Sequence, residues 1–310
     1  MKTLWYEKRI HGSHNSGMVL SLMKRMIASL CFLILLVWCP CYAAEEMTVT
    51  WLDMDIPPFY ILKGEYAGTG IADEITKLFQ QRLPQYTHKH ANVVFAKAME
   101  QFKSGESVCH AAFFKTPERE EFAYFSAVPS DIVPPVGITI KRKNLKQFET
   151  GATLSLAELL KNSELRCGAV KGRSYGTEID RLLEQYQGKS HVFLRTSGAM
   201  YEGMFSMLLA DRFDYLIGSP LEAMYASKIV SEKGEEIVNL PLQESSSCQV
   251  GYVACTKNEW GKQMIEHVNL ILRQERPTER YKTFFEKWLD ERSIPQFRKD
   301  YEIICLQTGN

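Results

Sequence analysis

The segment Gly172-Arg173-Ser174-Tyr175-Gly176 has the spacing that best matches a catalytic motif. It fits the G-x-S-x-G pattern that exposes a serine nucleophile in hydrolases, and Asp214 and His267 follow in the hydrolase order. His267, however, falls in an amphipathic helical pattern, and residues 45–310 contain no H-G-G segment for an oxyanion hole. The segment therefore favours a glycine-rich turn between a strand and a helix, whose backbone N–H groups could attract a carboxylate or a phosphate.

Arg119 lies in a second stretch that could carry chemistry, Thr116–Glu121. Thr116 can cap a short helix whose first turn holds Pro117 and acidic residues. The strand before it ends in Phe113-Phe114, so one ring should be buried and the other should face a ligand. From these residues alone, Arg119 is best explained as part of a surface ion pair, because such pairs are common and contribute little.

Two histidines and two aspartates complete the candidates. His88 and His90 could point both imidazoles to one side of a strand, but no third metal ligand is nearby, so no metal site is expected. Asp53 and Asp55 follow a strand and precede a loop. Aspartates at strand ends usually satisfy turns, although a general-acid role is the alternative.

Composition and charge exclude several classes of protein. The 310 residues are 45% hydrophobic, which is too apolar for a disordered chain. Basic and acidic residues balance at 37 each, so the chain lacks the basic surface of a nucleic-acid binder. No nucleic-acid partner is expected.

The N-terminal segment has the order of a secretory signal peptide. Lys24-Arg25 precedes the apolar run Ile27–Trp38, and Ala43-Ala44 follows. The run is shorter than the ~20 residues that a membrane-spanning helix needs. We therefore expect residues 1–44 to be a signal peptide cleaved near Ala43 or Ala44, with 1–22 as an upstream extension, and a periplasmic mature protein.

Cleavage would leave five cysteines in an oxidising compartment. Their number is odd, so at least one thiol is free or pairs outside the chain. No C-x-x-C pair remains, which argues against a redox or zinc-ribbon site. The sequence leaves the pairing open among Cys109, Cys167, Cys248, Cys255 and Cys305.

Strand and helix patterns alternate along the chain and predict an α/β protein with parallel sheets covered by helices. The pattern occurs twice, in sets of roughly 100 residues, which favours two lobes with a cleft between them over one continuous sheet. The first set has strands at 47–52, 93–95 and 108–114 and helices at 71–83 and 97–104. Then come a strand at 133–140, an α/β set over 156–229, a strand at 249–255, and helices at 260–274 and 278–292.

At this level the chain resembles the extracellular solute-binding proteins of family 3, the amino-acid-binding type that serves ABC importers. The resemblance covers nearly all of residues 47–292. It rests on the order of several soft motifs, namely 55–60 (DIPPFY), 68–75 (GTGIADEI), 115–120 (KTPERE), 122–126 (FAYFS), 136–139 (VGIT), 168–175 (GAVKGRSY) and 211–217 (DRFDYLI).

The resemblance implies a two-lobed type II periplasmic-binding fold that closes on a small solute, with lobe 1 at 45–138 and 256–310 and lobe 2 at 139–255. It implies a monomer without a cofactor, with an ABC permease of the inner membrane as partner. In this family the arginine that matches Arg119 clamps the carboxylate of the ligand. The turn at Gly172, Arg173 and Ser174 would donate hydrogen bonds, and Phe59 and Tyr60 would form an aromatic wall beside Asp55.

Two positions depart from the family pattern. Ser219 stands where the family has the aspartate that binds the ammonium group of the ligand, with Glu222 three residues later, and Phe114 replaces a small hydroxyl residue. These changes keep the carboxylate clamp but remove the usual ammonium partner, so an organic acid, an aromatic acid or a modified amino acid is the better expectation. Cys109 and Cys255 are not general features of the family either, and we expect them to pair and join two strands near the hinge.

Binding is the leading interpretation, and two others stay open. The same fold can host dehydratase chemistry, in which case Glu222, Asp53 or Asp55 would be the acid. The chain could instead be a sensor input protein that signals through a separate partner.

Overall fold

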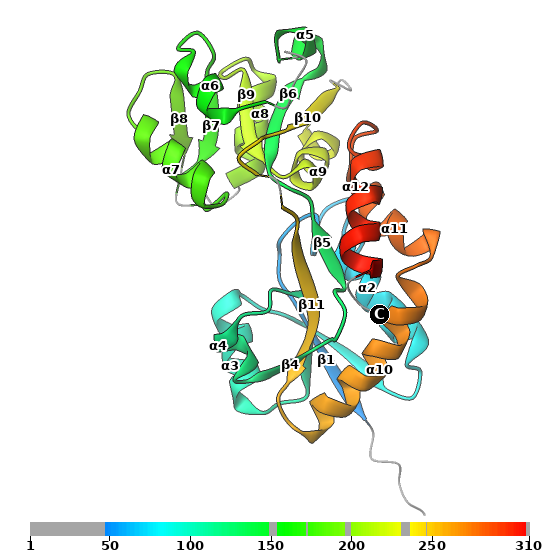
Figure 1. Ribbon diagram of the computed structural model, residues 1–310. Coiled ribbons are helices and arrows are strands. Elements are labelled where there is room, and N and C mark those ends of the chain that lie inside the picture. The colour runs from blue at the N-terminus through cyan, green and yellow to red at the C-terminus, as the bar shows by residue number, and fades with distance from the viewer. Residues whose placement is uncertain are drawn as a thin grey trace, which may run out of the picture. The chain divides into compact units, whose positions relative to one another are not determined.

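The computed structural model describes residues 47–148, 154–171, 173–195, 200–230, 236–245 and 247–307 (Figure 1). The expected signal peptide, with Ala43 and Ala44, and the loop glycine Gly172 lie outside the described residues. Within the described ranges, no helix has the length and apolar character needed to cross a membrane.

The first sheet has the strand order β2-β1-β3-β11-β4, and β5 also pairs with β11. The pairs β1–β2 and β1–β3 are parallel, whereas β11 runs antiparallel to β3, β4 and β5. The strands are β1 (Thr48–Asp53), β2 (Thr87–Asn92), β3 (Val108–Phe113), β4 (Ala123–Phe125), β5 (Asp131–Val133) and β11 (Gln249–Thr256).

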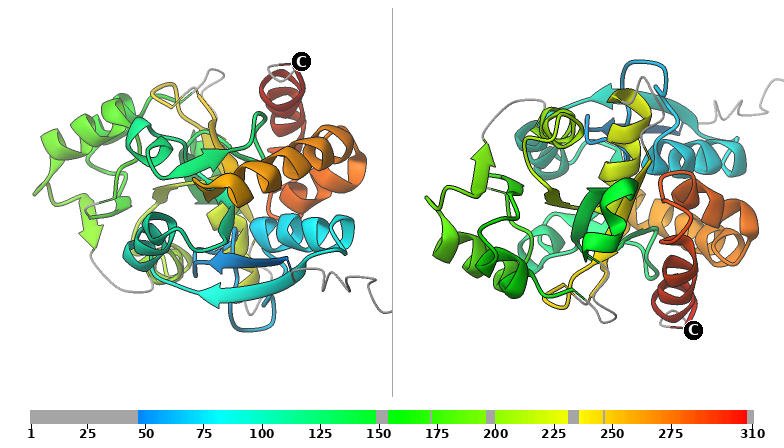
Figure 2. Two further views of the ribbon diagram at one scale, coloured as in Figure 1. Left: turned by 90° about the horizontal axis from the view of Figure 1, so that it is seen from below. Right: turned by 90° about the horizontal axis from the view of Figure 1, so that it is seen from above.

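Helices that lie between its strands in the chain, or follow its last strand, bury its apolar faces. Figure 2 shows α2 and α10 side by side, and Trp51 on β1 stacks on Phe79 of α2 with ring centroids 5.5 Å apart. The helices are α2 (Ile71–Arg82), α3 (Phe95–Ser104), α4 (Pro117–Glu120), α10 (Glu259–Glu275), α11 (Glu279–Glu286) and α12 (Ile294–Tyr301), which runs into a π-helical turn (Glu302–Gln307).

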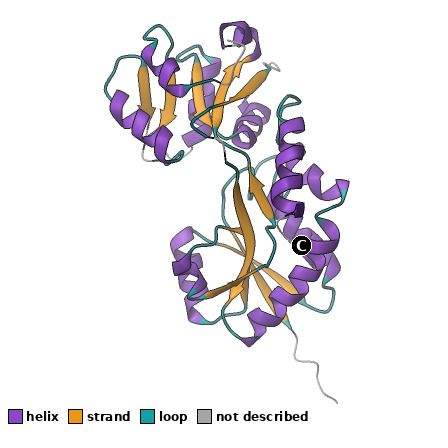
Figure 3. Cartoon of the chain, in the orientation of Figure 1, coloured by secondary structure: helices purple, strands orange, loops and turns teal. Residues whose placement is uncertain are grey.

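The second sheet has the order β10-β6-β9-β7-β8, and its own core is formed with residues of α6, α7, α8 and α9. Figure 3 shows helices in purple around the orange strands of this sheet. Its strands are β6 (Gly137–Lys141), β7 (Cys167–Val170), β8 (Val192–Arg195), β9 (Tyr215–Gly218) and β10 (Ile237–Pro241). Its helices are a 3-10 turn (Arg142–Asn144), α5 (Leu145–Phe148), α6 (Leu156–Lys161), α7 (Thr177–Tyr186), α8 (Met200–Leu209) and α9 (Pro220–Val230).

Both sheets are mixed, whereas the alternation of strands and helices predicted mostly parallel ones. The antiparallel strands come from two segments that pass between the sheets, β5–β6 and β10–β11 (Figure 1). The strand predicted at 133–140 is therefore two strands, because Pro134-Pro135 interrupts the ladder between β5 and β6. β11 belongs to the first sheet, although the lobe boundary expected at residue 255 placed it in the second lobe.

Other elements differ from the prediction by a few residues. The strand expected at 93–95 is β2, at Thr87–Asn92, and α3 already begins at Phe95. The helix expected at 278–292 ends at Glu286. The strands β3 and β11 are joined by a disulfide between Cys109 and Cys255, the pairing that we expected for these two cysteines. The thiols of Cys167, Cys248 and Cys305 are free.

Candidate functional site

A cavity of about 340 Å³ lies at the end of the first sheet and is also lined by three residues of the second α/β set. It brings together eight of the residues singled out in the sequence, namely Phe59, Tyr60, Phe113, Phe114, Arg119, Arg173, Ser174 and Glu222. It also includes residues that sequence reasoning did not select, namely Met54, Ile56, Phe95, His110, Ala112, Asp131, Val133 and Gln249. The cavity is large enough for a small solute.

Arg119 is held in place by the local sequence around it. Thr116 accepts a hydrogen bond from Arg119 N at 3.3 Å and so caps α4, as the sequence predicted. The guanidinium lies over the rings of Phe113, at 4.2 Å, and Phe95, at 5.2 Å, and Nη1 donates to Phe114 O at 2.6 Å. These contacts orient a cation whose hydrogen-bonding capacity is largely unused.

The charge of Arg119 is not neutralised within the described part of the chain. No carboxylate of the described residues forms an ion pair with it, although Glu118 favours its charged form. Burial lowers the pKa of the Arg119 guanidinium from its ordinary value, but an arginine stays protonated in proteins. The interpretation as a surface ion pair is therefore wrong, and Arg119 is a free cation at a pocket.

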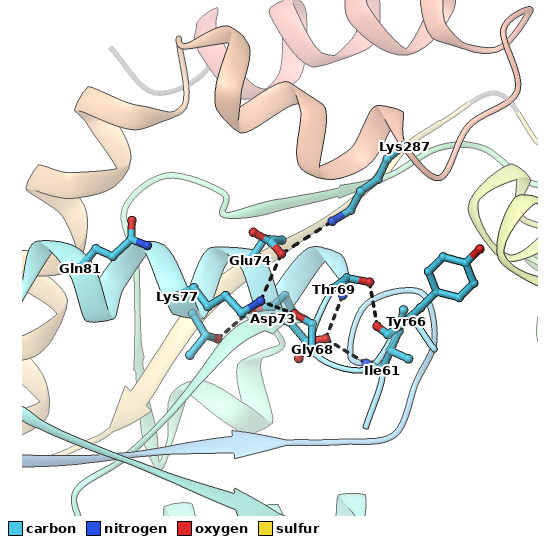
Figure 4. A network of polar contacts seen from close by, with 12 residues as sticks. Ile61, Tyr66, Gly68, Thr69, Asp73, Glu74, Lys77, Gln81 and Lys287 are labelled. Carbon is cyan, nitrogen blue, oxygen red and sulfur yellow. Dashed lines mark hydrogen bonds and ion pairs between the residues drawn. The ribbon is translucent and has the colours of Figure 1, made fainter. Parts of the chain in front are cut away.

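A polar network fixes the loop that carries the aromatic wall. Asp73 on α2 accepts hydrogen bonds from Ile61 N at 3.0 Å and Gly70 N at 2.9 Å (Figure 4). Lys77 Nζ donates to Gly68 O at 2.5 Å in the same network. A side chain at position 70 would collide with the carbonyl oxygen of Phe59. The network thus holds the loop against α2 and sets the position of the wall that begins at Phe59.

The aromatic residues that line the cavity include both buried and exposed rings. Tyr60 is 1% exposed, and its hydroxyl accepts a hydrogen bond from Ala111 N at 3.1 Å. Phe113 is 3% exposed and Phe114 is 44% exposed, so the expected split between a buried and an exposed ring is confirmed. Phe95 is also exposed, at 49%. Exposed rings at a cavity indicate surface that a bound solute could cover.

The second set contributes a charged pair and a hydroxyl. Arg173 Nη2 lies 2.8 Å from Glu222 Oε2, and the guanidinium lies 5.4 Å from the ring of Tyr175. Ser174 Oγ donates to Asp180 Oδ2 at 2.5 Å. Glu222 therefore has a cationic partner already, and Ser174 is engaged by the helix α7 rather than by a catalytic base.

Two predicted binding residues do not line the cavity. Asp55 is paired with Lys63 Nζ at 3.4 Å on the surface. Ser219 is 4% exposed, and its hydroxyl accepts from Leu221 N at 3.3 Å at the start of α9. Local hydrogen bonds and charges thus satisfy both side chains away from the cavity.

His110 is a cavity residue that the sequence patterns did not reveal. It is 2% exposed on β3, and its Nδ1 accepts a hydrogen bond from Ala112 N at 3.2 Å. The remaining proton must therefore sit on Nε2, which has no partner among the described residues. Burial, together with the charge of Arg119, lowers the pKa of His110 to about 3, so the ring is a neutral donor.

Asp131 is the second unexpected polar residue. It is 4% exposed at the start of β5, and its Oδ1 is buried without a hydrogen-bond partner among the described residues. Burial raises the pKa of Asp131 to about 7, although Ile132 N donates a hydrogen bond to the carboxylate. In the sequence, Ser130-Asp131 looks like an ordinary turn, and only its pairing with β11 takes it into the core.

The structure keeps the members of the predicted hydrolase triad apart. Nδ1 of His267, on α10, lies 3.3 Å from Oη of Tyr86, and Oδ1 of Asp214 lies 3.0 Å from Nη2 of Arg166. Neither residue therefore interacts with Ser174. Over the described ranges, no group of three or more potential ligands could hold a metal ion.

The H-x-H histidines have structural partners instead. Trp51 Nε1 donates to His88 Nδ1 at 3.0 Å, and His88 Nε2 lies 2.9 Å from Leu83 O. His90 Nδ1 lies 2.7 Å from Asp53 Oδ2. Both rings therefore tie β2 to its neighbours.

Comparison with solved structures identifies the fold. The probable amino-acid ABC transporter extracellular-binding protein YtmK from Bacillus subtilis matches with a TM-score of 0.59 and 18% identity over 80% of this chain and 100% of that chain. An ancestral amino-acid-binding protein, a precursor of cyclohexadienyl dehydratase, matches with a TM-score of 0.51 and 17% identity over 79% of this chain and 96% of that chain. A histidine kinase sensor domain similar to periplasmic binding proteins matches with a TM-score of 0.50 and 18% identity over 78% of this chain and 96% of that chain.

At identities this low, the structural likeness shows a shared fold alone. The chain thus has the fold of the two-lobed extracellular solute-binding proteins, as the sequence resemblance implied. No protein-family model matches the sequence, and no curated protein sequence is similar to it.

Proposed function

We propose that this protein is an extracellular solute-binding protein that captures a small carboxylate-bearing solute. The observation that carries the proposal is the Arg119 guanidinium, which lines the cavity, is oriented by two aromatic rings and has no carboxylate partner in the described ranges. A planar guanidinium with free N–H donors fits a carboxylate in a bidentate pair.

In this proposal, residues of the α/β set around the first sheet bind the solute, and residues of the second α/β set complete its enclosure. The carboxylate of the solute pairs with Arg119, and its apolar part covers the exposed rings of Phe95 and Phe114. Arg173 and Ser174 contribute donors from the other set, because both line the same cavity. Closure around the solute would remove water from the charged pair and strengthen it.

The cellular role follows from the N-terminal pattern and the fold. We propose that residues 1–44 direct the protein to the periplasm and are removed near Ala43 or Ala44. The mature protein then delivers its solute, as a monomer, to an ABC permease in the inner membrane. The likeness to a histidine kinase sensor domain supports the alternative that this chain is a periplasmic sensor input protein, which signals through a separate partner.

One observation supports an enzyme as the second candidate function. Asp131 lines the cavity and burial raises its pKa to about 7, which suits a general acid for elimination chemistry. The three acids considered from the sequence are less suited, since Glu222 is paired with Arg173, Asp53 with His90 and Asp55 with Lys63. Recovery of the bound solute unchanged after long incubation would support binding over catalysis.

A thermal-shift screen of the mature protein tests the proposal. A solute at about 100 times its Kd should stabilise the fold by about 2.7 kcal/mol. The variant Arg119→Ala should lose this stabilisation. Arg181→Ala is the matched control, because Arg181 pairs with Glu178 on the exposed face of α7 and does not line the cavity. Undiminished binding by Arg119→Ala would exclude the clamp.

A further inference from the structure

Two of the free thiols, those of Cys248 and Cys305, lie in the same apolar core. Cys305 is 2% exposed in the π-helical turn that follows α12, and Cys248 is partly exposed immediately before β11. Both pack in the core that the first sheet forms with its helices. The third free thiol, that of Cys167 on β7, belongs to the separate core of the second sheet.

Contacts with α12 bring the Cys248 and Cys305 thiols near each other. The Cys248 thiol donates a hydrogen bond to the carboxylate of Asp300 on α12. Cys305 follows Asp300 by about one helical turn, which is ~5 Å along the helix axis. Burial raises the pKa of Cys248 to about 12, and the charges of Asp300 and Cys305 add to this effect. The two thiols are therefore close enough to interact within one core.

Arg276 places a positive charge beside the Cys305 sulfur. The residue is 3% exposed, and Nε and Nη2 of its guanidinium have no hydrogen-bond partner among the described residues. Burial raises the pKa of the Cys305 thiol to about 12, whereas Arg276 favours the thiolate. The thiolate is the nucleophile of disulfide exchange, and a neighbouring cation stabilises it. Arg276 thus has the position of a group that assists attack by Cys305 on a nearby sulfur.

We propose that Cys248 and Cys305 form an oxidation site, at which a second disulfide joins the start of β11 to the turn after α12. The oxidant is a disulfide, either of a small thiol or of a thioredoxin-like protein. Cys248, the more exposed thiol, loses its proton to water and attacks the oxidant, which forms a mixed disulfide and releases one thiolate. Cys305 then loses its proton, attacks the Cys248 sulfur and expels the second thiolate. Both cysteines are oxidised, and the oxidant is reduced to two thiols.

The bond would connect α12 to a segment that passes between the two sheets. Gln249, which directly follows Cys248, lines the solute cavity. Asp300 of α12 shares a second cavity, of about 260 Å³, with Pro134 and Pro241 of the crossing segments (Figure 1). A cross-link restricts the unfolded chain, so the oxidised protein should be the more stable form. The inference does not depend on the solute, because no residue of the carboxylate clamp takes part.

Incubation of the folded protein with oxidised glutathione, followed by peptide mapping without reductant, tests the proposal. Trypsin should release Cys109, the pair Cys248 and Cys255, and Cys305 in the separate peptides 104–115, 234–257 and 300–310. Without the second disulfide, only the first two peptides are linked, through Cys109 and Cys255. After oxidation, all three peptides should be linked. Further cleavage after Tyr252 separates Cys248 from Cys255 and shows which of them holds Cys305.

Three variants separate the roles of the thiols. Cys305→Ser should leave Cys248 as a glutathione adduct, because the second thiol is missing. Cys248→Ser should leave Cys305 unmodified in the folded protein, because Cys305 is buried. Cys167→Ser is the matched control, since Cys167 lies in the other core, and it should form the bond as the wild type does.

The unfolding midpoint in urea should rise on oxidation of the wild type and of Cys167→Ser, and stay unchanged in Cys305→Ser and Cys248→Ser. Circular dichroism of each variant shows that the fold is intact. If the wild type accumulates glutathione on Cys248 while peptide 300–310 stays unlinked, or if Cys305 becomes linked to a cysteine other than Cys248, the proposal is overturned.

Discussion

Replacement of Asp131 by asparagine should stabilise the protein without ligand at neutral and alkaline pH. The carboxyl group is buried without a cation, so its ionised form is unfavourable in the folded state. Asparagine has nearly the same shape and carries no charge. A group retained at a cost in stability is expected at a binding site, where the ligand supplies the missing partner.

The pKa of Asp131 sets the size and sign of this effect. Burial raises the pKa from 3.8 to about 7. The protonated group therefore contributes stability that is fully present below pH 3.8 and is lost as the pH rises to about 7. The difference corresponds to about 4 kcal/mol. Asp131→Asn should thus equal the wild type near pH 4 and exceed its stability by about 4 kcal/mol at pH 8.

The titratable groups near Asp131 should not change how the stability difference between the two proteins depends on pH. Burial raises the pKa of Tyr281 well above its ordinary value and that of Cys305 to about 12, so both are neutral over the measured range. Burial lowers the pKa of His110 in the folded protein to about 3, so this histidine takes up a proton below about pH 6.5 only on unfolding. This effect is the same in both proteins and cancels in the difference between their free energies of unfolding.

Urea unfolding of both proteins at pH 4, 6 and 8 measures the difference. The free energy of unfolding should diverge progressively between pH 4 and pH 8, with Asp131→Asn the more stable protein at the upper end. A difference that stays constant with pH, or a variant that is less stable at pH 8, would show that Asp131 is ionised and satisfied in the ligand-free fold. The reasoning about an unpaired buried acid would then be wrong.

Three further predictions concern other parts of the chain. The hydrogen bond to Asp53 raises the pKa of His90. The pair therefore stabilises the fold fully below pH 6.5, and this contribution is lost as the pH rises through the raised pKa. The substitution His90→Gln should lower the free energy of unfolding in urea by about 0.5–1 kcal/mol at pH 5 and leave it nearly unchanged at pH 9. Removal of the Cys109–Cys255 disulfide by double substitution with alanine should cost about 2–5 kcal/mol in the same assay, and an unchanged unfolding midpoint would contradict a stabilising role. Ser174→Ala should leave any hydrolysis of p-nitrophenyl esters at the background rate, since Ser174 binds Asp180 rather than a histidine; loss of a measurable activity would revive the hydrolase interpretation.

Local sequence determined a large part of the fold and one end of the site. The α2 helix and the Thr116 cap of α4 form as predicted, because helix starts, caps and apolar spacing act over a few residues. The position of Arg119 on α4, the short helix that follows β3, is explained by the same signals. Its role was not readable from them, since neighbouring glutamates suggested an ion pair that the structure does not form.

Tertiary structure, and not local sequence, brings the buried polar residue Asp131 to the cavity. Asp131 becomes buried because β5 pairs with β11, a strand far along the chain, and Gly251 leaves space for its side chain. The loss of exposure by Ser219 and the pairing of Glu222 with Arg173 likewise depend on contacts between segments. Burial and long-range pairing, which no short pattern encodes, determine which charged groups have partners and which, like Asp131, form no ion pair among the described residues.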